Sequence, residues 1–137
     1  MAITIRIDYQ GELRCEATHG PSGNHFHTDA PVDNNGKGQS FSPTDLVATA
    51  LATCMATVIG IKARQKGYDL AGMKVSVEKH MSADSPRRIT RLPVTIEIPL
   101  PPDHPDRRLL EATALGCPVH HSVHPEIDKP VTFVWNG

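Results

Sequence analysis

The stretch from Ser42 to Gly67 constrains the fold of this chain most, because it has the length and both end signals of one long helix. Ser42 is a preferred N-cap residue, Pro43 suits the first helical position, and Asp45 can complete a capping box. Three basic residues lie in the last turns, and Gly67 can adopt the left-handed conformation that ends many helices. We therefore predict one helix of roughly 24 residues, about 36 Å long.

The middle of this helix is apolar on nearly every side. Between Leu46 and Ile61 it has no charged residue, and its polar side chains are three threonines. Such a helix is typical of a buried core element, and its apolar length is short for a membrane span. Helical periodicity predicts that Cys54 lies on a buried stripe. The other members of the stripe are Val47, Ala50, Leu51, Val58 and Ile61.

Length, charge and composition limit the classes of protein to which this chain can belong. A length of 137 residues predicts a single domain over residues 1–137. A formal net charge of −1 and 4% aromatic residues argue against nucleic-acid binding. The N-terminus lacks the basic and apolar segments of a secretion signal, so we expect a cytoplasmic protein. In that compartment Cys15, Cys54 and Cys117 are expected to be free thiols, and any disulfide would be transient.

Alternation of apolar and polar residues predicts strands on both sides of the long helix. The predicted strand segments are 2–8, 13–17, 25–28, 73–81, 89–98 and 131–135. Pro93 has no N–H to donate, so the 89–98 strand should lie at an edge or contain a bulge. The predicted class is α+β, with mostly antiparallel sheet around a long buried central helix.

Two shorter helices are predicted in the last third of the chain. The first should be capped by Asp103 or His104, carry Pro105 in its first turn, and end at Gly116. A proline directly after Cys117 predicts that this cysteine is the N-cap of another, short helix.

Cys117 is the clearest candidate for chemistry. A thiol at a helix N-terminus faces unpaired N–H groups and the positive end of the helix dipole, which should lower its pKa. His120, His121 and His124 follow closely enough to add to this effect or to shuttle protons. The alternative is a cysteine that only caps and packs.

The cysteines leave three interpretations open. Cys54 and Cys117 could be a peroxide-reducing dithiol, in which one sulfur attacks the O–O bond and the other resolves the sulfenic acid as a disulfide. Cys117 could bind zinc with the nearby histidines, but only one thiol lies in that cluster, and neighbouring histidines on a helix cannot all converge on one ion. Both cysteines could instead be small packing residues. Cys15 lies in a predicted strand with no chemical signal beside it.

Two segments together resemble the osmotically inducible / organic hydroperoxide resistance (OsmC/Ohr) family. They are FSPTDLVATALATCMATVI at 41–59 and GCPVHHSV at 116–123. The family has a Ser/Asn-Pro start, a long buried helix with the first cysteine, and a distant Cys-Pro-Val with the second. The resemblance covers nearly the whole chain. It implies an OsmC-like fold and an intertwined homodimer with active sites at the interface, and we expect no cofactor and no metal.

The resemblance also implies roles for individual residues. Cys54 matches the peroxidatic thiol and Cys117 the resolving thiol. In family members an arginine from an N-terminal strand and a glutamate ten residues before the first cysteine activate the thiol. Arg14 matches the arginine by position, with a solvated surface charge as its alternative role. Thr44 stands at the glutamate position, and the neighbouring Asp45 is turned about 100° away on the helix, where capping is its alternative role.

We therefore predict a cysteine-based reductase of organic hydroperoxides with Cys54, Cys117, Arg14 and Asp45 as site residues. Cys54 would attack the peroxide, Cys117 would form the disulfide, and an external dithiol would reduce it. The alternative is a non-catalytic protein of the same fold that binds an apolar small ligand in the cavity of the dimer interface. Thr44 at the glutamate position favours this alternative. Neither prediction includes a nucleic-acid or membrane partner.

Overall fold

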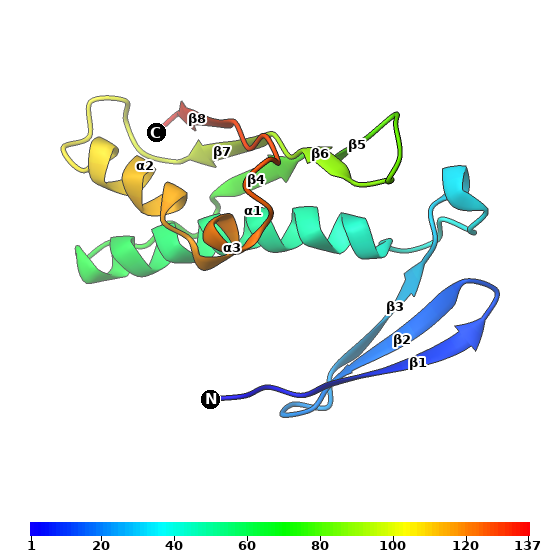
Figure 1. Ribbon diagram of the computed structural model, residues 1–137. Helices are drawn as coiled ribbons and strands as arrows, with labels where there is room; N and C mark the ends of the chain where they lie inside the picture. Colours follow the sequence, from blue (N-terminus) through cyan, green and yellow to red (C-terminus); the bar gives the residue numbers. More distant parts are fainter. The chain divides into compact units, whose positions relative to one another are not determined.

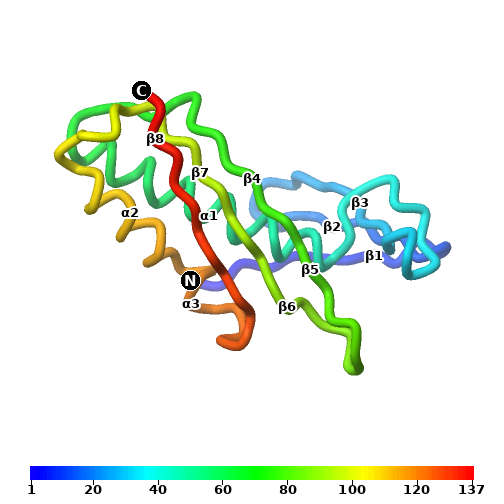
Figure 2. The backbone as a smooth tube through the Cα atoms, turned by 90° about the horizontal axis from the view of Figure 1, so that it is seen from above, coloured from blue at the N-terminus to red at the C-terminus, as the bar shows by residue number.

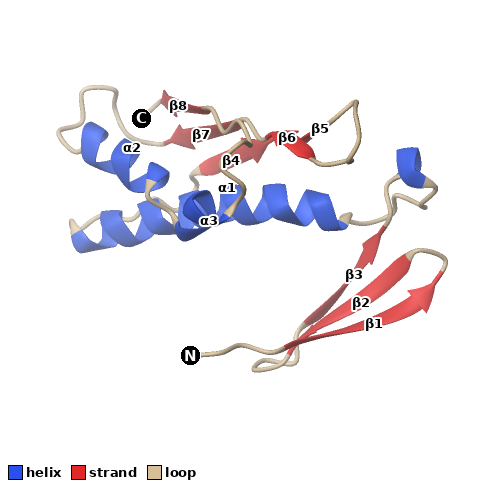
Figure 3. Cartoon of the chain, viewed as in Figure 1, coloured by secondary structure: helices blue, strands red, loops and turns tan.

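The computed structural model describes residues 1–137, which divide into two compact units, Met1–Leu46 and Val47–Gly137 (Figure 1). The first unit contains strands β1 (Ile5–Gly11), β2 (Arg14–His19) and β3 (His25–Asp29) and the 3-10 helix η1 (Val32–Asn34). Helix α1 (Pro43–Gln65) begins in the first unit and continues in the second. The second unit adds β4 (Lys74–Val77), β5 (His80–Met81), β6 (Ile89–Arg91), β7 (Val94–Ile98), α2 (Arg107–Leu115), α3 (Pro118–Ser122) and β8 (Val131–Trp135). The predicted α+β class is confirmed (Figure 3).

The strands of the first unit form an antiparallel sheet in the order β1-β2-β3. Glu12 and Leu13 both have positive φ, of 53° and 64°, and make the two-residue turn between β1 and β2. Such a turn matches the twist of a hairpin and lets β1 run up to Gly11. The predicted strand at 2–8 was therefore placed too early, and Leu13 belongs to the turn.

The two faces of this sheet differ in chemistry. One face carries Ile5, Ile7, Tyr9 and Phe26, which are all exposed in the single chain. The prediction that the first strand is half-buried is therefore wrong for the chain alone. The opposite face carries charged cross-strand neighbours, such as Glu16 opposite His27. The cross-strand neighbours on this face are therefore polar pairs.

Helix α1 begins and ends as predicted. The Ser42 N–H donates to Asp45 Oδ2 at 2.9 Å, and the Asp45 N–H donates to Ser42 Oγ at 3.1 Å, which is a complete capping box. At the other end Gly67 has a φ of +93° and donates to the Arg64 carbonyl, while the Tyr68 N–H donates to the Ala63 carbonyl. These two bonds form a Schellman motif, which satisfies carbonyls that the helix leaves unpaired.

The buried stripe of α1 differs from the predicted one. It consists of Ala48, Leu51, Ala52, Met55, Ile59 and Ala63. Cys54 is partly buried beside this stripe, whereas Ile61 is exposed. In an almost uniformly apolar helix the faces differ little in hydrophobicity, so the spacing of apolar residues does not identify the buried face. The prediction therefore selected a neighbouring stripe. By length and composition α1 could cross a membrane, with a mean hydropathy of 1.8, but the core helix of a soluble protein passes the same test.

The main sheet of the second unit has the order β4-β7-β8, and Figure 2 shows these strands side by side. β4 pairs with β7 in the antiparallel sense and β8 pairs with β7 in the parallel sense, so the parallel pair is the exception to the predicted pattern. The predicted strand at 89–98 is divided by Leu92 and Pro93 into β6 and β7. β7 lies in the centre of its sheet, so the edge position predicted from Pro93 is wrong, because the proline lies between the strands.

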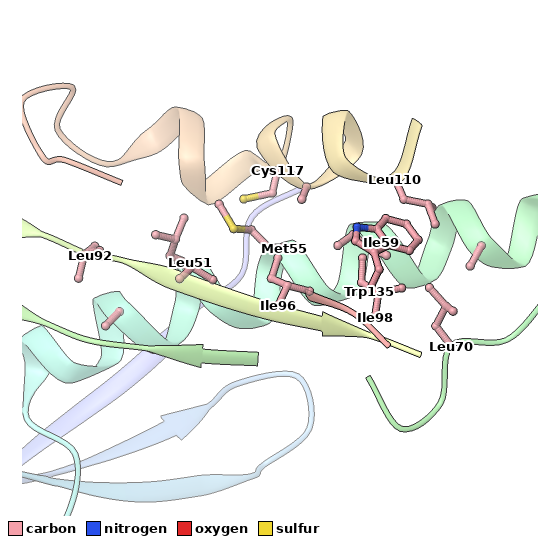
Figure 4. Close-up of a cluster of buried hydrophobic side chains, with 14 residues drawn as sticks. Leu51, Met55, Ile59, Leu70, Leu92, Ile96, Ile98, Leu110, Cys117 and Trp135 are labelled. Carbon is pink, nitrogen blue, oxygen red and sulfur yellow. The ribbon is translucent and has the colours of Figure 1, made fainter. Parts of the chain in front are cut away.

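The core of the second unit is packed between α1, this sheet and α2 (Figure 4). Its largest fully buried side chains include Leu51, Met55, Ile96 and Leu110. Helix α2 starts at Arg107, later than predicted, because the residues before it form a turn in which the His104 ring accepts the Asp106 N–H. Gly116 follows α2 as predicted. It leads directly to Cys117 and α3.

Candidate functional site

The structure brings Cys54 and Cys117 together in the second unit. Cys54 comes from the middle of α1, and Cys117 directly precedes α3. Cys54 packs against the buried core cluster that contains Cys117, and both cysteines are free. Cys117 has no exposed surface, and Figure 4 shows its sulfur beside the side chain of Met55. This arrangement brings together two thiols that lie far apart in sequence.

Cys117 is the N-cap of α3, as predicted. Its sulfur accepts a hydrogen bond from the His120 N–H at 3.2 Å. The expected lowering of its pKa is nevertheless wrong, because burial raises the pKa of the Cys117 thiol more than this bond lowers it. The Cys54 side chain raises the pKa of Cys117 further. Cys117 is therefore held as a neutral thiol.

The histidines after Cys117 form no metal site. The rings of His120 and His121 meet edge to face with their centroids 5.7 Å apart. The Nδ1 atom of His120 is buried without a hydrogen-bond partner, and burial, Lys129 and His121 all lower the pKa of this imidazole. No group of three or more His, Cys, Asp or Glu residues is arranged to hold an ion.

Arg14 lies in the first unit. It does not have its alternative role of a solvated surface charge, because its guanidinium is hydrogen-bonded within the protein. Its Nε donates to Asp29 Oδ1 at 2.8 Å, and its Nη2 donates to Asp29 Oδ2 at 2.9 Å. Nη2 also donates to Gln39 Oε1 at 2.9 Å. The bond from Arg14 holds the pKa of Asp29 below its usual range, and Asp29 in turn raises the pKa of Arg14.

Asp29 is the residue that sequence reasoning missed. It ends β3, directly opposite Arg14 of β2. An acidic residue opposite a basic one on the same face of a hairpin forms a cross-strand ion pair, but the predicted strand ended at Thr28, one residue before Asp29. The family resemblance pointed instead to an acidic residue near the start of α1.

Asp45 and Thr44 lie at that helix start. The Asp45 carboxylate accepts a hydrogen bond from the Ser42 N–H in the capping box. Asp45 therefore has the capping role that was its predicted alternative. The Thr44 hydroxyl is 3.2 Å from the Ser42 hydroxyl. These contacts hold the first turn of α1 in place.

A cavity of about 390 Å³ lies between α1 and the strand β4. Its lining is almost entirely apolar or small, and consists of Thr49, Ala52, Thr53, Ala56, Met73, Val75 and Val77. Thr53 and Ala56 are on the same helical turn as Cys54. The cavity could accept an apolar group of a small ligand.

Comparisons with known proteins agree with this fold. Residues 36–129 match the family described as OsmC-like protein. A Psychrobacter arcticus crystal structure, provisionally named as an osmotic stress induced and detoxification response protein, is 48% identical to this chain. That match covers 95% of this chain and 94% of the other, with a TM-score of 0.89. A search of curated protein sequences found no match.

Two more distant structures share the fold. The organic hydroperoxide resistance protein OsmC of Legionella pneumophila is 15% identical, with a TM-score of 0.77 and coverage of 98% of this chain and 97% of the other. The organic hydroperoxide resistance protein OhrB of Bacillus subtilis is 14% identical, with a TM-score of 0.68 and coverage of 97% and 98%. The family match spans more than half of the sequence, and the fold agrees with it. The chain therefore belongs to the OsmC-like protein family.

Proposed function

We propose that this protein reduces organic hydroperoxides through a thiol–disulfide cycle between Cys54 and Cys117. The observation that carries the proposal is the proximity of the two cysteines, because Cys54 packs against the core cluster that contains Cys117 and influences the pKa of its thiol. Such proximity favours a disulfide, which requires the two Cα atoms to lie within about 7 Å. The names of the Legionella and Bacillus proteins, which share the fold, support the substrate class.

The cycle has three balanced steps. The Cys54 thiolate attacks the O–O bond of ROOH, takes one oxygen as a sulfenic acid and releases RO⁻, which is protonated to the alcohol. The Cys117 thiol then attacks the Cys54 sulfenic sulfur, forming the disulfide and releasing water. Finally an external dithiol reduces the disulfide and is itself oxidised to a disulfide.

The surroundings of the thiols support this division of roles. Cys117 is fully buried and held neutral, which suits a thiol that reacts only after its neighbour has been oxidised. Cys54 is less deeply buried and is therefore the more accessible of the two to a substrate.

Arg14 and Asp45 complete the proposed set of site residues. Arg14 is proposed as the positive charge that favours the attacking thiolate, on the basis of its position in the family resemblance. Asp45 is proposed to act indirectly, by fixing the first turn of the helix that carries Cys54.

We also propose a cytoplasmic homodimer. One face of the first unit's sheet carries the exposed side chains of Ile5, Ile7, Tyr9 and Phe26. Exposed apolar residues grouped in this way are typical of a surface that a partner covers. A second copy of the chain is the proposed partner, with the organic hydroperoxide and the external dithiol as small-molecule partners.

Steady-state consumption of cumene hydroperoxide with dithiothreitol as the reductant tests the function. Wild-type protein and the matched control Cys15→Ser should turn over, whereas Cys54→Ser should be inactive. Cys117→Ser can form no internal disulfide, so its turnover should depend on direct reduction of the Cys54 sulfenic acid by dithiothreitol. Equal consumption by wild type and Cys54→Ser would reject the proposal. The cavity supports a second candidate, non-catalytic binding of an apolar ligand, which would then be tested with a fluorescent fatty acid.

A further inference from the structure

The imidazole of His120 has a buried nitrogen that no group of the chain satisfies. Its Nδ1 atom lies in the interior without a hydrogen-bond partner, while the backbone N–H of the same residue donates to the Cys117 sulfur at 3.2 Å. A neutral imidazole can leave Nδ1 as an acceptor, whereas the protonated ring must place an N–H donor there. A buried charge with an unpaired donor costs far more than an unused neutral acceptor. The surroundings of the ring therefore favour its neutral form.

The charged groups around this ring also oppose a positive charge. Lys129, in the segment before β8, donates from Nζ to the Ile127 carbonyl at 2.9 Å, which fixes its ammonium group. The ring of His121, from α3 itself, meets the His120 ring edge to face. Burial, Lys129 and His121 all lower the pKa of His120, burial most. The Cys117 thiol supplies no negative charge, because burial raises its pKa and keeps it neutral. Protonation of His120 is thus opposed both by burial and by like charge.

Helix α3 is too short to be stable without its packing. It has five residues, and isolated helices of fewer than about 12 residues are marginal in water. Besides the bond to the Cys117 sulfur, the His121 N–H donates to the Cys117 carbonyl at 3.3 Å, and the Val123 N–H donates to the Val119 carbonyl at 3.1 Å. Two of these bonds end on Cys117, which has no exposed surface. The folding of α3 and the burial of Cys117 are therefore linked.

His124, which follows α3, lacks these features. Its side chain is exposed, and its Nδ1 accepts a hydrogen bond from the Glu126 N–H at 3.1 Å. An exposed imidazole can gain a proton at little cost, because water solvates the charge. His124 is therefore a matched control for His120 in the same part of the chain.

We propose that the neutral His120 ring is an acid-sensitive latch that keeps α3 folded and Cys117 buried. A proton taken from solvent opens the helix, so that Nδ1 reaches water and the Cys117 sulfur loses the His120 N–H. Because the folded-state pKa of His120 is lowered, the latch is fully closed above the ordinary value of about 6.5, and its stabilising effect is lost as the pH falls below that value. The latch needs no peroxide and goes beyond the proposed function.

Amide hydrogen exchange of the reduced protein at pH 7.5 and pH 5.5 tests the proposal. The measured quantity is the protection factor, which compares each amide with an unstructured peptide at the same pH. At pH 5.5 an ordinary imidazole is about 10-fold more protonated than neutral, so the protection factors of the α3 amides should fall by up to about 10-fold. The amides of β7, in the centre of its sheet, should keep theirs.

Variants identify the titrating group. His120→Phe retains an aromatic ring but cannot be protonated, so α3 should stay protected at pH 5.5. His124→Asn, the matched control, should show the same fall in protection as wild type. If His120→Phe does not fold, Lys129→Met replaces it. This variant removes a charge that lowers the pKa of His120, so the fall in protection should be smaller than in wild type.

Alkylation by N-ethylmaleimide measures the exposure of Cys117 in the same samples. Its rate, relative to that of the urea-unfolded protein at the same pH, should rise by the factor by which α3 protection falls. The latch is wrong if wild-type α3 keeps its protection at pH 5.5, if the substituted variant loses as much as wild type, or if β7 loses as much as α3. No peroxide enters these measurements, so their outcome is independent of the proposed function.

Discussion

Asp29 and Cys117 are buried to the same extent, with 1% and 0% of their surfaces exposed, yet their pKa values shift in opposite directions. The pKa of Cys117 is raised because burial disfavours the thiolate and one backbone N–H compensates only in part. The pKa of Asp29 is lowered because Arg14 and the Gln39 N–H outweigh burial. The partners of a buried group, and not its depth, therefore decide whether it is charged.

The largest expected effect comes from the apolar surroundings of Cys117. Met55→Ala removes the buried side chain beside its sulfur and should cost about 2–5 kcal/mol of the free energy of unfolding. Water that enters the cavity should also bring the pKa of Cys117 down toward its ordinary value. Urea unfolding and the ultraviolet absorbance of the thiolate, measured with Cys15 and Cys54 replaced by serine, check both results.

A surface variant provides the control. Leu109→Ala removes a leucine that α2 exposes and should change stability by no more than about 0.5 kcal/mol. Equal losses in Met55→Ala and Leu109→Ala would contradict the description of the Cys117 surroundings as a packed core.

The next effect concerns the ionised Asp29. Its folded-state pKa lies below the value of about 3.9 in an unfolded chain, so its stabilising contribution is present at neutral pH and is lost as the pH falls through the folded-state pKa. Asp29→Asn should lower the urea midpoint at pH 7, and its difference from wild type should shrink between pH 5 and strongly acidic solution. If the difference in urea midpoint between Asp29→Asn and wild type stays constant with pH, the ion pair is not the source of the stability that the variant loses.

A smaller effect is expected at the start of α1. Ser42→Ala removes the acceptor of the Asp45 N–H and should cost about 1 kcal/mol of the free energy of unfolding. Ser76→Ala, which removes an exposed hydroxyl of β4, provides the comparison. Identical urea midpoints for Ser42→Ala and wild type would contradict the capping box.

The smallest effect is expected for an exposed pair. Glu12 and Lys37 form a short ion pair at the surface of the first unit. Glu12→Gln should leave the urea midpoint unchanged, because solvent and salt screen such pairs. A loss as large as that of Asp29→Asn would remove the distinction between buried and exposed pairs.

Local signals in the sequence predicted the parts of the fold that depend on a few neighbouring residues. The caps at Ser42 and Gly67 and the N-cap role of Cys117 follow from residue type alone, and the structure confirms them. The buried face of α1 was predicted wrongly because an apolar helix has no contrast between its faces. The parallel pairing of β8 depends on contacts far apart in sequence.

The candidate site also has parts that the local sequence predicts and parts that depend on the fold. The motifs identified both cysteines, but only the structure brings them together in one core. The direction of the Cys117 pKa shift depends on burial, which the local sequence does not specify. Asp29 escaped notice because its importance comes from the register of β2 and β3 and from a loop that returns to them.

The most direct test of the central claim is mass spectrometry of the cysteines after reduced protein reacts with one equivalent of cumene hydroperoxide. We predict rapid formation of one Cys54–Cys117 disulfide, and a trapped sulfenic acid at Cys54 in Cys117→Ser. If both thiols remain reduced for as long as an ordinary free thiol takes to react, the claim that this pair is a redox couple is wrong.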